Sequence, residues 1–221
     1  MERLHIFSGH FGSGKSELAV NFAIKCADAG EKVSIVDLDI VNPYFRTNDA
    51  RKILEEHGIE VIAPEFANSN LDMPTVPGDI MKVFNNPGRV VIFDVGGDED
   101  GAYALGRYIE HFKRESYKMH LVVNQKRPLT ETAEEIVSMA REIEYASRLK
   151  VTDIINNSNI GKLTDSETVL SSIPVVEEAS RLLGVDISMI GVKNGNNILL
   201  PKELDEKVFN IDIKIKMPWE K

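Results

Sequence analysis

Residues 9–16 read Gly9-His10-Phe11-Gly12-Ser13-Gly14-Lys15-Ser16, which matches the pattern Gly-x-x-x-x-Gly-Lys-[Ser/Thr]. The apolar run Leu4-His5-Ile6-Phe7 precedes this octet, and residues 17–23 follow it with helical periodicity. A strand, a glycine-rich loop and a helix in this order form the phosphate-binding loop of many nucleotide-binding proteins. The sequence therefore predicts a phosphate-binding site at residues 9–16.

The residue types in the octet suit this chemistry. Three glycines allow positive φ and a close approach of the backbone to a ligand. The N–H groups of the loop and of the first helical turn then point at the phosphates, and the helix dipole favours the negative charge. Lys15 is expected to bridge the β and γ phosphates, and the Ser16 hydroxyl to bind Mg²⁺. The predicted nucleotide contacts here are Gly9, His10, Phe11, Gly12, Ser13, Gly14, Lys15, Ser16 and Glu17.

Composition limits the classes of partner. The chain has 221 residues and a formal charge of −9, so we expect one domain over residues 1–221 without the basic face that nucleic acids or anionic membranes require. No apolar run approaches the roughly 20 residues of a membrane span. A strand follows the first residues at once, so we expect no signal peptide and a cytoplasmic protein. Cys26 is the single cysteine and falls on the apolar stripe of the first helix.

Strand and helix patterns alternate along the whole chain, which predicts an α/β fold: a mostly parallel central sheet with helices on both faces. The expected strands are 4–7, 32–37, 59–63, 89–94, 118–123, 151–155 and 187–192, the last of which would close the sheet. The expected helices are 14–29, 47–57, 78–86, 100–116, 130–148 and 164–183, the last with a possible split at Pro174. Residues 64–78 form a long loop. The alternating tail 209–217 is expected to be an edge strand or an extended arm.

Acidic residues follow two of the predicted strands, where ligands bind in such sheets. Asp37 and Asp39 end the second strand and would order Mg²⁺ waters or orient an attacking water; the alternative is a turn cap and a solvated loop residue. Asp94 ends the most apolar strand and precedes Val95-Gly96-Gly97, the Walker B arrangement, in which the acid holds Mg²⁺ through water. We therefore expect Ser16, Asp37, Asp39 and Asp94 around the metal ion.

Amides and arginines supply further candidates. Asn157 ends another strand, and its amide offers a donor and an acceptor that suit a purine edge; Asn124 is a comparable candidate. For both, a role in shaping a turn is an equally good interpretation. Arg46, Arg107 and Arg127 are possible stabilisers of transition-state charge, although each is more often a surface residue.

Together, these motifs resemble the MinD/ParA/CobQ group of P-loop ATPases over residues 3–195. The resemblance implies a three-layer P-loop NTPase fold that binds ATP/ADP and Mg²⁺. It also implies that Asp39 supports the attacking water and that Asn157 contacts adenine. Members of the group form ATP-dependent dimers, and those that hydrolyse ATP across a dimer usually carry a second lysine after the first loop glycine. His10 holds that position here.

The leading hypothesis is an Mg²⁺-dependent ATP-binding protein with slow ATPase activity. It would act as a nucleotide-dependent switch or homodimer on a protein partner. The alternative is a small-molecule ligase or kinase of the dethiobiotin-synthetase type, with loop 64–78 and Arg46 binding the substrate. A third hypothesis is a nucleotide-binding module that never hydrolyses its ligand. The chain has no Asn-Lys-x-Asp guanine motif, which favours ATP over GTP.

Overall fold

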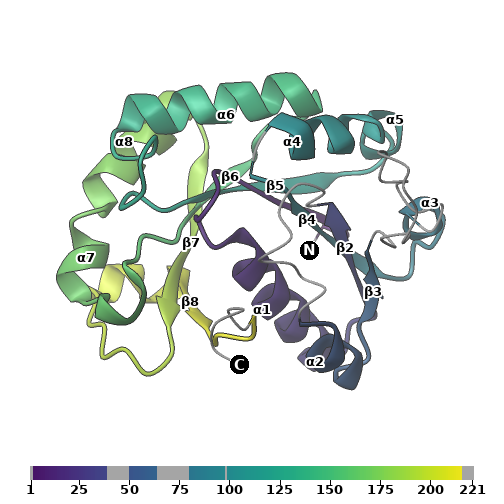
Figure 1. Cartoon of the computed structure of the whole chain (residues 1–221), viewed down its shortest axis with the longest axis horizontal. Coiled ribbons are helices and arrows are strands. Elements are labelled where there is room, and N and C mark those ends of the chain that lie inside the picture. Colours follow the sequence, from purple (N-terminus) through teal and green to yellow (C-terminus); the bar gives the residue numbers. More distant parts are fainter. Residues whose placement is uncertain (1, 39–49, 64–79, 98, 216–221) are drawn as a thin grey trace, which may run out of the picture.

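The computed structural model describes residues 2–38, 50–63, 80–97 and 99–215, which contain one eight-stranded sheet (Figure 1). The strand order is β3-β2-β4-β1-β5-β6-β7-β8, and every neighbouring pair runs parallel. The strands are β1 (Leu4–Ser8), β2 (Val33–Leu38), β3 (Glu60–Ile62), β4 (Val90–Val95), β5 (Tyr117–Val123), β6 (Asp153–Asn156), β7 (Asp186–Lys193) and β8 (Val208–Ile211). The predicted α/β class is confirmed.

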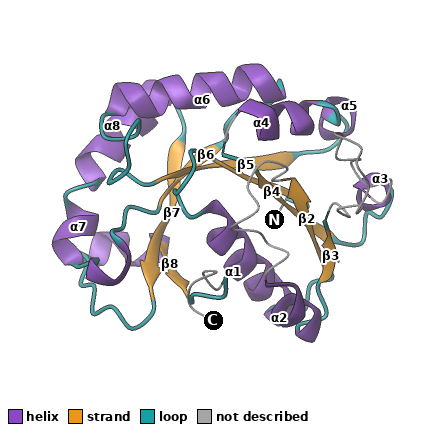
Figure 2. Cartoon of the chain, in the orientation of Figure 1, coloured by secondary structure: helices purple, strands orange, loops and turns teal. Residues whose placement is uncertain are grey.

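Helices cover both faces of the sheet (Figure 2). The helices α1 (Lys15–Asp28) and α2 (Arg51–Glu56) pack on one face. The helices α3 (Ile80–Phe84), α4 (Glu99–Gly106), α5 (Ile109–Phe112), α6 (Ala133–Ser147) and α8 (Ile173–Leu183) pack on the other. The shorter α7 (Ser166–Leu170) and two 3₁₀ turns, η2 (Gly161–Leu163) and η3 (Lys202–Lys207), complete the described elements. None of the described helices is long and apolar enough to cross a membrane.

The strands are apolar because both of their faces are buried. In β1, Phe7 belongs to the core under α1, whereas Ile6 belongs to the core on the opposite face. Ile35 and Val36 of β2 divide in the same way. Two cores therefore sandwich the sheet, and the predicted three layers are confirmed.

Several helix boundaries differ from the expected ones. The helix predicted over 100–116 is two helices, and α4 ends at Gly106, where a Cβ would lie only 3.0 Å from the Ala146 carbonyl oxygen of α6. The helix predicted from residue 130 begins at 133, because Thr132 caps it and exchanges hydrogen bonds with Glu135. The split near Pro174 is confirmed, with this proline in the first turn of α8.

The expectation that 187–192 closes the sheet is wrong. The tail strand β8 pairs parallel with β7, with Ile190 opposite Val208 and Lys193 opposite Ile211. The prediction of an edge strand in the tail is therefore correct as far as Ile211, after which the chain leaves the sheet and passes over α1 (Figure 1).

A buried polar chain links three strands under α1. His5 of β1 and His120 of β5 face each other with 3.0 Å between Nδ1 and Nε2, and His120 Nδ1 lies 2.6 Å from a carboxylate oxygen of Asp153. His5 Nε2 donates to the Glu2 carbonyl oxygen, so its Nδ1 accepts the hydrogen bond from Nε2 of His120. The three side chains thus form one hydrogen-bonded chain from β1 through β5 to β6.

Burial and the neighbouring His120 lower the pKa of His5 from 6.5 to about 4. Burial alone would raise the pKa of Asp153, but hydrogen bonds from His120, Ser188 and Thr152 outweigh it and hold the pKa below its usual value. Burial and the neighbouring His120 therefore both favour neutral His5 in the folded state.

We predict that this preference makes stability depend on pH. Between pH 6.5 and 4 the unfolded chain binds a proton on His5 that the folded protein does not, so stability is lost as the pH falls through this window. The loss from this group amounts to up to about 3 kcal/mol. The variant His5→Gln cannot bind that proton, so its free energy of unfolding should fall less than that of the wild type over this pH range, as measured by urea unfolding. The exposed His57→Gln should behave like the wild type; equal slopes for His5→Gln and wild type would contradict the prediction.

Candidate functional site

The predicted phosphate-binding loop joins β1 to α1 at the carboxyl end of the sheet. Gly9 and Gly14 have φ of 147° and 86°. A Cβ at Gly9 would overlap the carbonyl oxygen of Val122 in β5, and one at Gly14 would collide with the side-chain nitrogen of Asn157. Only glycine fits at these two positions, so the loop can pack directly against β5 and the residue after β6.

A cavity of about 640 Å³ opens beside this loop, within the usual size range of small-molecule sites. The side chain of Lys15 lies in its wall and is only 6% exposed. A buried lysine next to backbone N–H groups at a helix start forms an anion site. Of the predicted nucleotide contacts, eight line the cavity and two, Gly9 and Ser13, do not; the eight are His10, Phe11, Gly12, Gly14, Lys15, Ser16, Glu17 and Asn157.

Asp37 and Asp94 are brought together as predicted. They are paired in register on the neighbouring strands β2 and β4, and both are buried. Asp37 and Asp94 each lie two positions after an isoleucine, Ile35 and Ile92, that packs in the core under α1. Because residues two positions apart in a strand share a face, both carboxylates lie on the α1 side of the sheet. Asp39, the third predicted acid, lies outside the described residues.

The glycines after β4 reach the phosphate-binding loop. A Cβ on Gly97 would lie 2.6 Å from the backbone nitrogen of Phe11 and 3.0 Å from Nζ of Lys15. Gly96 in turn packs against Gly101 of α4: a Cβ on Gly101 would lie 2.7 Å from the backbone of Gly96. The segment between the Asp94 carboxylate and α4 is therefore in direct contact with the loop that would hold phosphates.

The two candidate asparagines have different environments. Asn157 lines the cavity and donates from Nδ2 to the Ser13 carbonyl oxygen at 2.7 Å. Asn124 instead accepts from the backbone N–H groups of Lys126 and Asn159 through Oδ1, and it is not in the cavity wall. The turn-shaping interpretation applies to Asn124, whereas Asn157 holds the loop from the side of the cavity.

One of the three candidate arginines lies at the site. Arg127 lines the cavity, and its guanidinium lies within 3.4 Å of where a Cβ on Gly12 would be. Arg107 lies in the break between α4 and α5, away from the cavity wall. Arg46 and the loop 64–78 lie outside the described residues.

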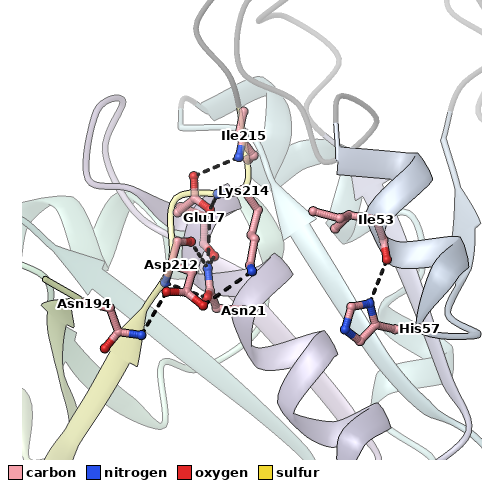
Figure 3. Close-up of polar contacts among 8 residues, drawn as sticks. All are labelled: Glu17, Asn21, Ile53, His57, Asn194, Asp212, Lys214 and Ile215. Carbon is pink, nitrogen blue, oxygen red and sulfur yellow. Dashed lines mark hydrogen bonds and ion pairs between the residues drawn. The ribbon is translucent and has the colours of Figure 1, made fainter.

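Glu17 lines the cavity, but its carboxylate is engaged elsewhere. It accepts hydrogen bonds from the backbone N–H groups of Lys214 at 2.6 Å and Ile215 at 3.2 Å (Figure 3). Burial raises its pKa to about 7, against the effect of these two bonds. The side chain of Glu17 thus holds the tail, which leaves its backbone N–H as its contribution to the loop.

Several cavity residues were not singled out from the sequence. Asn159, Lys162 and Thr164 follow β6, and Lys193 ends β7. Their positions after strands are the signal that could have found them. Three isoleucines of the tail, Ile211, Ile213 and Ile215, also line the cavity, and their alternation suggested only an edge strand.

The residues present fit a magnesium nucleotide. Two buried carboxylates and the Ser16 hydroxyl supply hard oxygen ligands of the kind that Mg²⁺ prefers, and Mg²⁺ usually takes the rest from phosphates and water. Among the described residues no three His, Cys, Asp or Glu side chains form a metal site by themselves.

Comparisons with known proteins agree with this geometry. The sequence model of the CobQ/CobB/MinD/ParA nucleotide binding domain matches residues 4–170. No curated protein sequence matches this chain significantly.

Solved structures share the fold. The cell division protein FtsY of Thermotoga maritima superposes with a TM-score of 0.58 at 21% identity, over 86% of this chain and 61% of that one. Chloroplast FtsY of Physcomitrella patens superposes with a TM-score of 0.60 at 16% identity, over 91% of this chain and 62% of that one. A third structure is the signal recognition particle 54 kDa protein of Aeropyrum pernix K1 in complex with GDP. It superposes with a TM-score of 0.56 at 17% identity, over 86% of this chain and 41% of that one. This chain thus spans 41–62% of the length of these three structures.

At these identities the structural likeness establishes the fold alone, and the family match carries the assignment. That match runs from β1 to the end of α7 and includes the phosphate-binding loop, Asp37, Asp94 and Asn157. The predicted resemblance is confirmed: this chain belongs to the CobQ/CobB/MinD/ParA family of nucleotide-binding domains.

Proposed function

We propose that this protein binds ATP with Mg²⁺ in the cavity, hydrolyses it slowly, and works as a nucleotide-dependent switch on a protein partner in the cytoplasm. The observation that carries the proposal is the buried Lys15 in the wall of a cavity of about 640 Å³, beside a loop whose glycines leave no room for side chains. The continuous sheet from β1 to β8 supports one nucleotide-binding domain over residues 1–221.

The roles follow from the positions of the side chains. Lys15 binds the β and γ phosphates, and Ser16, Asp37 and Asp94 hold Mg²⁺, directly or through water. The bound ion would neutralise charge that develops on the phosphates. Asp39 is assigned to the attacking water, as the family resemblance implies. Asn157 lines the cavity, and we assign it to adenine, as the family resemblance implies and as the absence of a guanine motif in the sequence favours.

The switch role rests on Gly97. Because this residue touches both the Phe11 backbone and the neighbourhood of Lys15 Nζ, a phosphate bound at the loop would meet the segment that leads into α4. Segments that contact a γ-phosphate through a backbone N–H change position when that phosphate is lost. A movement there would reach the surface of α4, where a partner or a second copy could respond.

Removing the Lys15 ammonium tests nucleotide binding directly. Lys15→Ala should weaken Mg-ATP about 10- to 100-fold, since charge-assisted hydrogen bonds to the phosphates are lost. Isothermal titration calorimetry measures this effect, with the exposed Lys113→Ala as the control. Unchanged affinity in a Lys15→Ala protein that unfolds at the wild-type temperature would sink the proposal.

Filling the space at Gly97 tests the link to α4. Gly97→Ala should weaken Mg-ATP about tenfold, because the new methyl group must displace the Phe11 backbone or Lys15. Gly88→Ala is the matched control, since its Cβ would meet only the flexible Asn86 side chain at 3.6 Å. If both alanine variants bind Mg-ATP equally well, Gly97 has no part in the site.

Light scattering tests the homodimer that the family resemblance implies. We expect a monomer with ADP and a doubled mass with a slowly hydrolysed ATP analogue. Lys15→Ala should stay monomeric with both ligands. The same mass for the wild type in both nucleotides would contradict a nucleotide-dependent dimer, and strong stimulation of ADP release by a small carboxylate or amine would favour the metabolic enzyme instead.

A further inference from the structure

The segment that follows β8, residues 212–215, is fastened across the first turns of α1; we call it the C-terminal strap. The Asn21 side chain pairs with the Asp212 backbone in both directions: Nδ2 donates to its carbonyl oxygen, and Oδ1 accepts from its N–H, each at 2.9 Å. The Asn21 amide thus makes the two backbone hydrogen bonds that a neighbouring strand would make. The Glu17 carboxylate accepts from two further backbone N–H groups, those of Lys214 and Ile215 (Figure 3).

A second anchor comes from the sheet. Asn194, just after β7, donates from Nδ2 to a carboxylate oxygen of Asp212 at 2.9 Å. The strap is therefore tied both to the helix that begins with Lys15 and to the end of β7 (Figure 3). Its position relative to the phosphate-binding loop is fixed by hydrogen bonds rather than by apolar packing alone.

The strap and the last residue of β8 place three isoleucines on the cavity. Ile211 and Ile215 are each 5% exposed and belong to the core under α1, whereas Ile213 is 55% exposed. All three line the cavity that the phosphate-binding loop also lines. We call them the isoleucine wall.

The wall is continuous with the loop through two residues. Asn157 donates to the Ser13 carbonyl oxygen, and its Oδ1 lies against Gly191 of β7. A Cβ on Gly191 would overlap that oxygen and would lie 2.9 Å from Cδ1 of Ile211. Loop, Asn157, Gly191 and isoleucine wall thus form one uninterrupted surface, with no room for another side chain at the junction.

We propose that the isoleucine wall receives the flat face of the nucleotide base, so that the C-terminal strap is part of the nucleotide site. This inference rests on the proposed function, because it assumes that phosphates bind at the loop. A ligand that fits this cavity needs an anionic end for the loop and an apolar, flat end for the wall. Purine nucleotides have both. The edge of the ring would then face the polar side chains that follow β6, namely Asn157, Asn159 and Thr164.

The wall gives affinity through apolar contact, and it does so only while the strap is in place. Glu17 and Asn21 are accordingly positioning residues: neither needs to touch the base, and both hold the isoleucines at the cavity. Since Glu17 directly follows Ser16, the first turn of the phosphate-binding helix α1 also holds the isoleucine wall in place.

The test compares two ligands that share phosphates but differ in the base. Mg-ATP and Mg-tripolyphosphate are titrated into the full chain by calorimetry. Ile213→Ser removes apolar surface from a half-exposed position without adding charge, and it should weaken Mg-ATP about five- to tenfold while changing tripolyphosphate less than about twofold. Ile213→Leu should restore the affinity for ATP, and Leu182→Ser, an exposed leucine on α8 away from the cavity, should leave both affinities unchanged.

Asn21→Ala tests the strap separately. It should reduce the preference for Mg-ATP over tripolyphosphate about as much as Ile213→Ser does, an effect that a general loss of stability would not produce. The wall is overturned if Ile213→Ser keeps the wild-type preference, or if it weakens both ligands equally. A wild type that binds tripolyphosphate and ATP with equal affinity also overturns the wall but leaves the phosphate site standing. A wild type that binds neither ligand overturns the proposed function itself.

Discussion

The hydrogen bond between Asn157 and the Ser13 carbonyl oxygen fixes the geometry on which the site depends. It is 2.7 Å long and buried, and the backbone N–H of Asn157 donates to the Val123 carbonyl oxygen at the same distance. One residue thus ties the phosphate-binding loop to the end of β5. Gly14 must lack a side chain because the amide of Asn157 already fills that space. The loop therefore has its shape before any ligand arrives, which reduces the conformational entropy that binding would cost.

The carboxylates beside the loop impose a second constraint. Asp37 and Asp94 lie in register on adjacent strands and are almost fully buried, and two ionised carboxylates on adjacent strands would repel each other in a medium of low dielectric constant. Such an arrangement is stable when cationic groups share the region, as Lys15 does at the start of α1. An incoming divalent cation lowers the cost further. The carboxyl ends of β2 and β4 are thus electrostatically suited to a metal-bound triphosphate.

Most of the fold and the positions of the central residues of the candidate site could be predicted, because both depend on local patterns. The octet, the apolar strands and the acid that ends β4 can each be recognised within a few residues. What could not be predicted depends on distant partners. The close approach of Gly106 to Ala146 of α6 joins residues 40 positions apart, and the different roles of Asn124 and Asn157 depend on which neighbours their amides meet.

The tail shows the same limit more sharply. Its alternation predicted a strand, and β8 is one, but no local pattern indicates that the chain leaves the sheet after Ile211. That departure depends on Asn21 and Glu17, nearly 200 positions earlier in the sequence, which hydrogen-bond Asp212, Lys214 and Ile215 at separations of 191, 197 and 198 residues. The polar side chains of Glu17 and Asn21 give no sign in the sequence of such distant partners.

This long-range closure has a thermodynamic consequence. Bringing the tail back to α1 costs loop-closure entropy, which rises only slowly with the length of the intervening chain. The pairing of β8 with β7 already brings the chain close to α1, so most of this entropy is lost when the sheet forms. The few hydrogen bonds of the strap then need to order only residues 212–215. A ligand that contacts the isoleucine wall adds to those bonds, so ligand binding and strap ordering stabilise each other by the same free energy. In the proposed site, residues 212–215 are thereby linked energetically to the phosphate-binding loop.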